Sequence, residues 1–156
     1  MRKRLLTVLL ICMLVFIWGN SLLSRELSGQ ISDGVMDVMN RAAARLGLGE
    51  DWFTYMYDQD GDGVEEPTSH IVRKIAHVTE FLVFGILVWL RLESGGVKRA
   101  ATAFLCGAFT GGVDELLQLF SHRGSLFSDV LIDAAGAAAG VLLAVTADAL
   151  IRKRKG

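Results

Sequence analysis

The sequence predicts an all-α membrane protein, a bundle of four transmembrane helices with one amphipathic helix in an extracytoplasmic loop. Apolar residues make up 52% of the 156 residues, and they are concentrated in four long blocks. A helix needs about 20 mostly apolar residues to cross the bilayer core, and each block supplies them. Charged residues lie mostly between the blocks, so the formal net charge of -1 hides a strong segregation of charged from apolar residues along the chain. No overall basic balance indicates nucleic acid as a partner.

The four predicted spans cover residues 5–23, 71–92, 97–120 and 126–151. We expect them to form one domain of residues 1–156. The first block could instead be a cleaved signal peptide, because Arg2, Lys3 and Arg4 precede it. No A-x-A cleavage site follows that block, so we predict that the span is retained. The other three blocks contain ionisable groups, which lower their mean hydropathy.

The orientation follows from the Lys and Arg residues beside the spans, because these residues are enriched on the cytoplasmic side. Ten of the sixteen basic residues fall in three clusters, at residues 2–4, 91–99 and 152–155. Four spans would place all three clusters on one side of the membrane. The loop of residues 24–70, with ten acidic and three basic residues, would lie on the other side. Both termini are therefore predicted to be cytoplasmic, in a multi-pass protein of the plasma membrane.

This outer loop contains a predicted amphipathic helix. Apolar residues recur at helical spacing from Ile31 to Leu46, and charged residues such as Asp37 fall on the opposite face. The helix should end near Gly47 or Gly49. It would lie on the outer membrane surface or cap the bundle.

A glycine-rich acidic segment further along the loop has the first residues of a calcium-binding pattern. Asp58, Asp60 and Asp62 occupy its first, third and fifth positions. The twelfth position is Ser69, although a bidentate glutamate is needed there. We interpret the segment as a solvated turn, and weak calcium binding from outside is the alternative.

Polar residues inside the predicted spans define a candidate site, because ionisable groups are costly in a membrane and each is a functional hypothesis by default. Alternating span directions would bring all of them to the outer half of the bilayer. The candidate pocket comprises His77 and Glu80 in the second span, Asp114, Glu115 and Gln118 in the third, Arg123 and Ser125 in the next turn, and Asp129 and Asp133 in the fourth. Its predicted rim comprises Asn20, Ser21 and Arg73. The alternative is a hydrogen-bonded network that only holds the bundle together.

Other residues are predicted to have structural roles. Glycines four residues apart, Gly107 with Gly111 and Gly136 with Gly140, should let helix backbones approach closely. Tryptophans such as Trp89 are predicted to be interfacial anchors. Asp148 should either snorkel to the interface or pair with Arg152, four residues further along the helix.

Three stretches carry a resemblance to a known family. They are Phe16–Ser21, then Arg73–Phe81 followed by Gly85, and then Asp114–Gln118 with Arg123–Ser125 and Asp129–Gly136. On these residues the chain resembles the VanZ-like family of small bacterial membrane proteins. That family often has Asn at the position of Asp133, so this chain departs mildly there. The resemblance implies a bacterial cell-membrane protein with a polar intramembrane site. The family is named for a protein linked to resistance to the glycopeptide antibiotic teicoplanin, and fold or family alone does not transfer that role.

Three classes of function fit these residues. The first is a binding protein of the cell envelope, whose outer pocket engages a lipid head group, a lipid-linked cell-wall precursor or an amphiphilic antibiotic. Arg123 would pair with a phosphate or carboxylate, while His77 and Gln118 would donate hydrogen bonds. The second is an intramembrane hydrolase or transferase acting on a lipid-linked substrate. His77 would then be the general base, Asp114 would orient it, and Arg123 would stabilise developing negative charge.

A divalent metal held by His77, Glu80, Asp114 and Asp129 belongs to the enzyme hypothesis, because His with several carboxylates suits zinc or manganese. The third class is an ion-coupled transporter, but its polar groups would stop in the outer half of the membrane. We rank binding first, the enzyme second and the transporter third. The sequence assigns no cofactor, ligand or oligomeric state, and it leaves open whether the chain is an enzyme.

Overall fold

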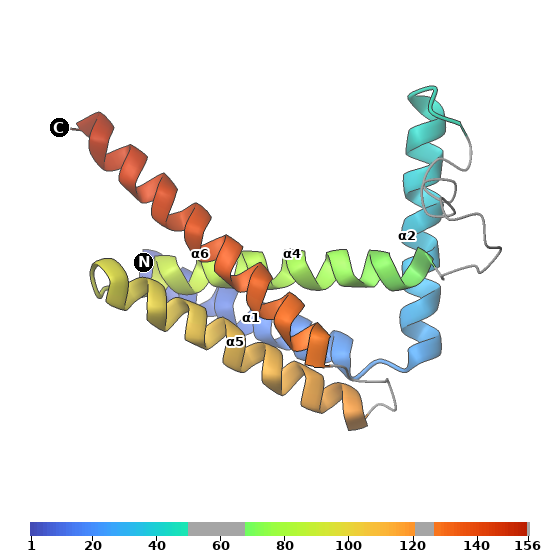
Figure 1. The fold of residues 1–156 in the computed structure, drawn as a ribbon, viewed down its shortest axis with the longest axis horizontal. Helices are drawn as coiled ribbons and strands as arrows, with labels where there is room; N and C mark the ends of the chain where they lie inside the picture. Colours follow the sequence, from blue (N-terminus) through green and yellow to red (C-terminus); the bar gives the residue numbers. More distant parts are fainter. Residues whose placement is uncertain (50–67, 121–126, 156) are drawn as a thin grey trace. The chain divides into compact units, whose positions relative to one another are not determined.

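The computed structural model describes residues 1–49, 68–120 and 127–155, and this part of the chain contains α-helices and no strand. The helices are α1 (Arg2–Ser21), α2 (Arg25–Arg45), α4 (Thr68–Arg91), α5 (Gly96–Phe120) and α6 (Phe127–Lys155) (Figure 1). The predicted all-α class is therefore confirmed. Four of these helices coincide with the four predicted spans, and α2 lies in the predicted outer loop.

Two of the described helices are long and apolar enough to cross a membrane, namely Arg2–Ser21 and Ser128–Arg154. In α4 and α5 the apolar sequence is interrupted by polar residues of the candidate site, such as Glu80 and Asp114. Such residues lower the mean hydropathy of a helix even when they face the inside of a bundle. The count of four spans therefore stays a prediction.

The chain divides into two compact units, residues 1–23 with 77–156 and residues 24–76. The first unit contains α1, α5, α6 and the part of α4 that begins at His77. The second contains α2 and the start of α4. This division into compact units does not test whether the chain is one domain, so the single domain stays a prediction.

Local sequence signals fix both ends of α2. The side-chain oxygen of Ser24 caps the helix by accepting a hydrogen bond from the backbone N–H of Leu27 at 3.3 Å. The helix ends at Arg45 with Leu46 as its C-cap, and Gly47 then adopts a positive φ of 79°. A glycine in this conformation commonly terminates a helix, because it has no Cβ to strain. A helix is thus present in the loop where the sequence predicts one. The location of this helix at the membrane surface stays a prediction.

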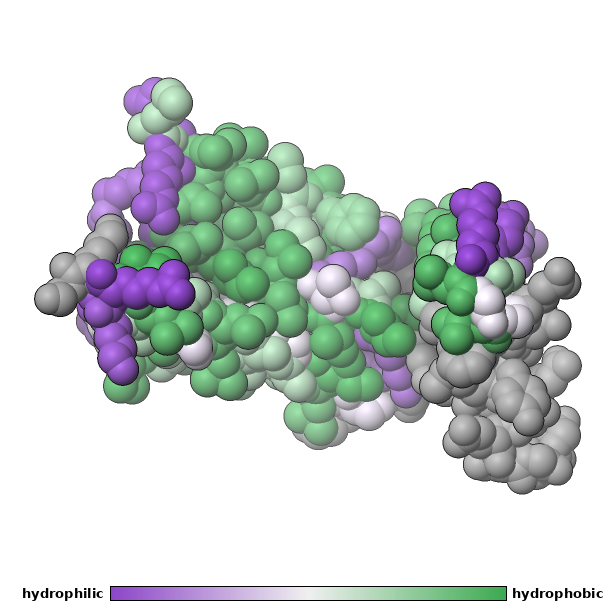
Figure 2. All heavy atoms as spheres, turned by 90° about the horizontal axis from the view of Figure 1, so that it is seen from above, coloured by the Kyte–Doolittle hydropathy of each residue, from purple (hydrophilic) through white to green (hydrophobic). Residues whose placement is uncertain are grey.

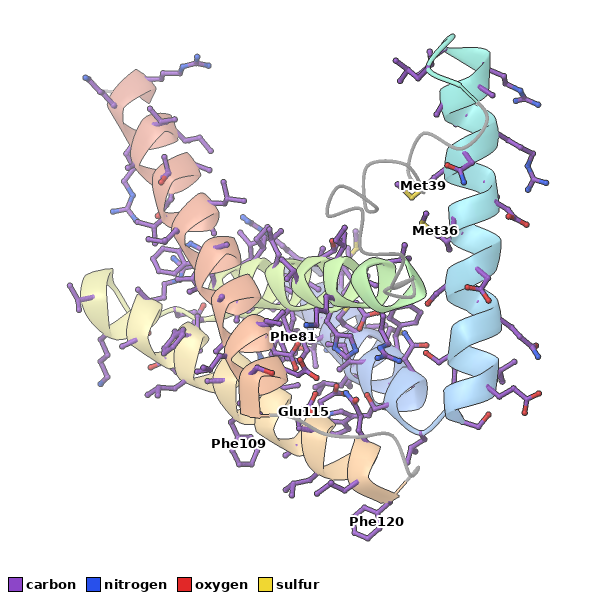
Figure 3. The ribbon with its side chains drawn as sticks, turned by 45° about the vertical axis from the view of Figure 1, so that its right-hand side comes forward. Met36, Met39, Phe81, Phe109, Glu115 and Phe120 are labelled. Atoms are coloured by element: carbon purple, nitrogen blue, oxygen red, sulfur yellow. The ribbon has the colours of Figure 1, made fainter. Side chains whose placement is uncertain are left out.

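The apolar core of the first unit draws on all four of its helices. It contains Ile17 of α1, Phe81, Phe84, Val88 and Trp89 of α4, Ala103 of α5, and Ala137 and Val141 of α6. Phe81 is completely buried, whereas Phe109 of α5 is 73% exposed. Figure 3 shows Phe81 between the helices and Phe109 and Phe120 projecting away from them. The bundle therefore has a packed interior and a separate apolar exterior.

That apolar exterior is extensive. Large side chains on each helix of the first unit are exposed, for example Val15, Leu90, Leu105 and Leu142. Figure 2 shows apolar side chains over most of the visible surface of these helices, with a group of hydrophilic side chains at one end. Soluble monomers rarely expose contiguous apolar surface of this kind, so a lipid-facing surface is indicated.

Small residues bring α6 into close contact with two neighbours. A Cβ added at Gly136 would lie 2.7 Å from the backbone oxygen of Val78 in α4. A Cβ added at Gly111 of α5 would lie 2.9 Å from the Cβ of Asp133. Cβ atoms essentially never come so close, so these positions require glycine for the observed packing. The predicted close approach at the spaced glycines is confirmed.

Candidate functional site

The direction of each helix brings the polar residues of the first unit to one end of the bundle. Asn20 and Ser21 lie in the last turn of α1, and Asp114 to Gln118 lie in the last turns of α5. Asp133 lies in the second turn of α6. We call the following residues the polar cluster: Asn20, Ser21, His77, Glu80, Asp114, Glu115, Gln118 and Asp133. Figure 3 shows polar side-chain atoms gathered around the labelled Glu115.

Hydrogen bonds link the members of the polar cluster across three helices. Asn20 Nδ2 donates to Glu80 Oε1 at 3.1 Å, which joins α1 to α4. Ser21 Oγ donates to Asp114 Oδ1, which joins α1 to α5. Within α5, Gln118 Nε2 donates to Asp114 Oδ2 at 3.0 Å and to Glu115 Oε1 at 2.9 Å. These spacings of three and four residues place the donor and its acceptors on one helix face.

His77 lies between two acidic residues from different helices. Its Nδ1 is 3.7 Å from Asp114 Oδ2 and 3.3 Å from Asp133 Oδ1. Both carboxylates are at most 1% exposed, so solvent does not screen their charge. Both Asp133 oxygens are buried and, among the described residues, neither has a hydrogen-bond partner. His77 therefore meets Asp133 at ion-pair distance but without hydrogen-bond geometry.

These three residues also have the composition of a metal-binding group. Each offers one ligand atom, and the atoms all lie within 4.8 Å of one another. The metal site predicted from the sequence shares His77 and Asp114 with this group. It contains Glu80 and Asp129, however, where this group contains Asp133. In the structure Glu80 accepts a hydrogen bond from Asn20, and Asp129 is outside the group.

Other predicted site residues have different positions. Asp129 is partly buried and lies 3.5 Å from the hydroxyl of Ser128. Arg73 belongs to the second unit. Arg123, Ser125 and the calcium-like residues Asp58, Asp60 and Asp62 lie outside the described residues.

Ser21 of α1 has a larger role than the sequence indicated. Ser21 was assigned to the rim, but it is 1% exposed and donates directly to Asp114. The indole Nε1 of Trp18 is buried, and it has no hydrogen-bond partner in the described part of the chain. Both residues lie in the last turn of α1. Their place at the end of an apolar span is the only signal of this burial in the sequence.

The opposite end of the first unit carries a basic cavity of about 380 Å³. Its lining includes Arg2, Lys3, Arg91 and Arg99, which come from the starts of α1 and α5 and the end of α4. Arg91 Nε donates to Thr7 Oγ1 at 2.9 Å, so the end of α4 is tied to α1. The three basic clusters are thus separated from the polar cluster along the helices.

Specific contacts order the side chains around this cavity. The guanidinium of Arg99 stacks over the ring of Trp89, 4.3 Å from its centroid. Trp89 is only 5% exposed, so the prediction that it is an interfacial anchor is wrong for its ring. Lys3 pairs with Glu93, and this ammonium holds the pKa of the exposed Glu93 carboxyl below its ordinary value. Arg152 donates to Asp148 at 2.7 Å. Of the two predicted alternatives for Asp148, pairing with Arg152 is therefore the one that the structure shows.

A helical bundle with an apolar exterior and a buried polar cluster defines the class of this chain, a helical membrane protein. The family described as VanZ/LLP1 matches residues 6–151, so the chain belongs to that family, and the resemblance is confirmed. The chain is also 38% identical over 65 residues to the uncharacterized membrane protein YwnJ of Bacillus subtilis (strain 168). That alignment covers 42% of this chain and 43% of the relative. No solved structure matches the chain.

Proposed function

We propose that the chain crosses the bilayer four times, with α1, α4, α5 and α6 as spans and both termini in the cytoplasm. The separation of charge along the helices supports this proposal, because Lys and Arg are enriched on the cytoplasmic side. The basic cavity draws its lining from segments that the four-span topology assigns to the cytoplasmic side. The polar cluster then lies in the extracytoplasmic half of the bilayer.

Labelling of single cysteines tests this topology. Cys12 and Cys106 are replaced by serine, and one cysteine is introduced by Gln30→Cys in α2 or by Gly95→Cys between α4 and α5. An added Cβ at Gly95 meets no atom within 4 Å, so the second change should be tolerated. A membrane-impermeant thiol reagent on intact cells should label the Gln30→Cys protein and spare the Gly95→Cys protein. The reverse pattern, or equal labelling of both, contradicts the proposed topology.

The polar cluster is proposed as a binding site for an amphiphilic ligand that enters from the outer leaflet. The observation that carries this proposal is the burial of Asp114, Glu115 and Asp133, each at most 3% exposed, at the meeting point of the helices. Buried like charges repel and are costly without compensation. His77 is the one member of the cluster that can be cationic, so a purely structural network would be an expensive use of these acids.

Candidate ligands share an apolar anchor and a polar head. They are a lipid head group, a lipid-linked cell-wall precursor and a lipid-bearing glycopeptide such as teicoplanin. His77 would donate a hydrogen bond to the head group, whereas Gln118 Nε2 already donates to Asp114 and Glu115 and would keep their carboxylates in place. Arg123, in the connection from α5 to α6, would pair with its phosphate or carboxylate. The apolar surface of the bundle would accommodate the anchor.

A growth assay tests the proposed glycopeptide role. A susceptible Gram-positive host expresses the wild type, His77→Ala or Asp114→Asn, and the minimum inhibitory concentration of teicoplanin is measured. Asp148→Asn is the matched control, because this acid lies at the opposite end of α6 and pairs with Arg152. Quantitative blotting of membranes ensures that only variants with equal levels are compared.

The proposal expects the wild type and the Asp148→Asn variant to protect the host, and the two cluster variants to lose protection. If all four proteins protect equally, the polar cluster has no part in tolerance. If none protects, glycopeptide tolerance is not the role of this chain. In that case binding of fluorescent lipid-linked precursors to the purified protein tests one of the two remaining candidate ligands.

A further inference from the structure

We propose that His77, Asp114 and Asp133 hold a divalent metal ion of the zinc class between α4, α5 and α6. Zinc binds nitrogen and oxygen ligands at about 2.0–2.2 Å, so two ligands of a tetrahedral ion are about 3.4 Å apart. His77 Nδ1 lies 3.3 Å from Asp133 Oδ1 and 3.7 Å from Asp114 Oδ2. All three ligand atoms fall within 4.8 Å of one another. To reach the ligand separation of about 3.4 Å, no pair of these atoms needs to come closer by more than about 1.4 Å.

Asp133 provides an independent indication of a ligand. The residue is 1% exposed, and both of its carboxylate oxygens are buried without a hydrogen-bond partner among the described residues. Leaving a buried carboxylate unsatisfied is costly. His77 contributes one nitrogen, at ion-pair distance from Oδ1, and thus addresses only one of the two oxygens. A divalent cation would supply both the missing charge and the missing coordination.

The surroundings of the three residues resemble the outer shell of a metal site. Ser21 Oγ and Gln118 Nε2 donate to the two oxygens of Asp114 and fix the orientation of its carboxylate. Partners of this kind orient metal ligands and strengthen metal binding. On the other side, the lack of a side chain at Gly111 lets the Cβ of Asp133 approach α5. The helix packing therefore holds the ligands from separate helices at one point.

The ligand types select among metals. One imidazole nitrogen with two carboxylates suits zinc or manganese, whereas calcium prefers six to eight oxygen ligands. Three protein ligands leave one position of a tetrahedral zinc ion open. That position would receive the anionic group of a bound head group. This role rests on the proposed binding function, but the metal site itself can be measured without it.

Metal binding is tested on the purified full chain in lipid nanodiscs. The protein is stripped with EDTA, exchanged into metal-free buffer and titrated with zinc, manganese or calcium, and bound metal is counted by mass spectrometry. The wild type should bind one zinc ion per chain. Asp133→Asn and His77→Gln should lower zinc affinity by more than the roughly 10–100-fold that loss of an outer-shell partner causes. Asp148→Asn, the same substitution at the other end of α6, should bind zinc as the wild type does.

A cobalt spectrum of the wild type provides a readout that does not depend on the variants. Tetrahedral cobalt at this site should give intense visible absorption, which zinc should displace. A wild type that binds no zinc and gives no such spectrum overturns the proposal. An Asp133→Asn protein that is monodisperse and retains full zinc affinity also overturns it.

The growth assay is scored separately from metal binding. Zinc binding without protection from teicoplanin supports the metal site and refutes the glycopeptide role. Protection by a wild type that binds no zinc refutes the metal site and leaves the binding function in place.

Discussion

Replacement of Gly136 by alanine should separate α6 from α4 and destabilise the bundle. The added Cβ would lie 2.7 Å from the backbone oxygen of Val78, 3.1 Å from its Cα and 3.2 Å from the Cβ of Phe81. Ordinary contact begins at 3.4 Å, so the distance to the oxygen must grow by about 0.7 Å. Two of these three atoms belong to the backbone, so a rotation of one side chain cannot make the room.

The magnitude follows from two opposing effects. Overpacking of a filled interface costs about 1–3 kcal/mol. Alanine in place of glycine favours a helix by about 1 kcal/mol. Gly112 of α5 is the matched control, because an added Cβ there meets no atom within 4 Å. Gly112→Ala should therefore keep or raise stability, and Gly136→Ala should be less stable than Gly112→Ala by about 1–3 kcal/mol.

Thermal unfolding in one detergent, followed by circular dichroism, measures the difference. For a chain of this length, 1 kcal/mol corresponds to a change in Tm of about 2–4 °C. Gly136→Ala should also loosen the polar cluster, because Val78 follows His77 and Gly136 lies one turn after Asp133. Equal Tm values for the two variants would refute the close contact between α4 and α6.

Three further predictions use other parts of the first unit. Gln118→Ala should destabilise the protein by about 1–3 kcal/mol in the same unfolding assay, because two buried carboxylates lose a donor. Phe81→Ala should cost about 3–5 kcal/mol, whereas Phe109→Ala, at an exposed position, should leave Tm nearly unchanged; equal losses would contradict the assigned core. Lys3→Ala should raise the pKa of Glu93 toward its ordinary value, which carbon NMR of that carboxyl can follow. The pair's small contribution is present above the ordinary carboxyl pKa and lost as pH falls through the lowered one, so an unchanged Glu93 titration would contradict the pairing.

The sequence was sufficient to predict the helices and the end of the bundle at which the polar residues meet. Long apolar blocks bounded by basic residues fix where helices form, and their alternating directions bring Ser21, Asp114 and Asp133 together. Glycine spacing predicted where α6 contacts its neighbours, because close approach requires small residues at spacing four. These inferences use periodicity and direction along the chain, which are local properties.

The point at which the helices cross decides which acid of α6 lies beside His77. Asp129 and Asp133 are one turn apart on the same face of α6, so periodicity cannot distinguish them. The contacts of Gly111 and Gly136 set the crossing point, and they select Asp133. Likewise, Asn20 and Glu80 are 60 residues apart, so nothing local predicts their hydrogen bond.

The energetics of the first unit favour a functional reason for the polar cluster. Replacement of buried ionic groups by well-packed apolar residues is often neutral or stabilising, so the acids are a poor means of holding helices together. The core around Phe81 and the glycine contacts of α6 already supply dense packing. The same Gly111 that permits this packing brings Asp133 toward Asp114, so close packing and the concentration of acidic groups share one cause. A ligand or ion that compensates these charges would bind to a site that the helix packing has already assembled.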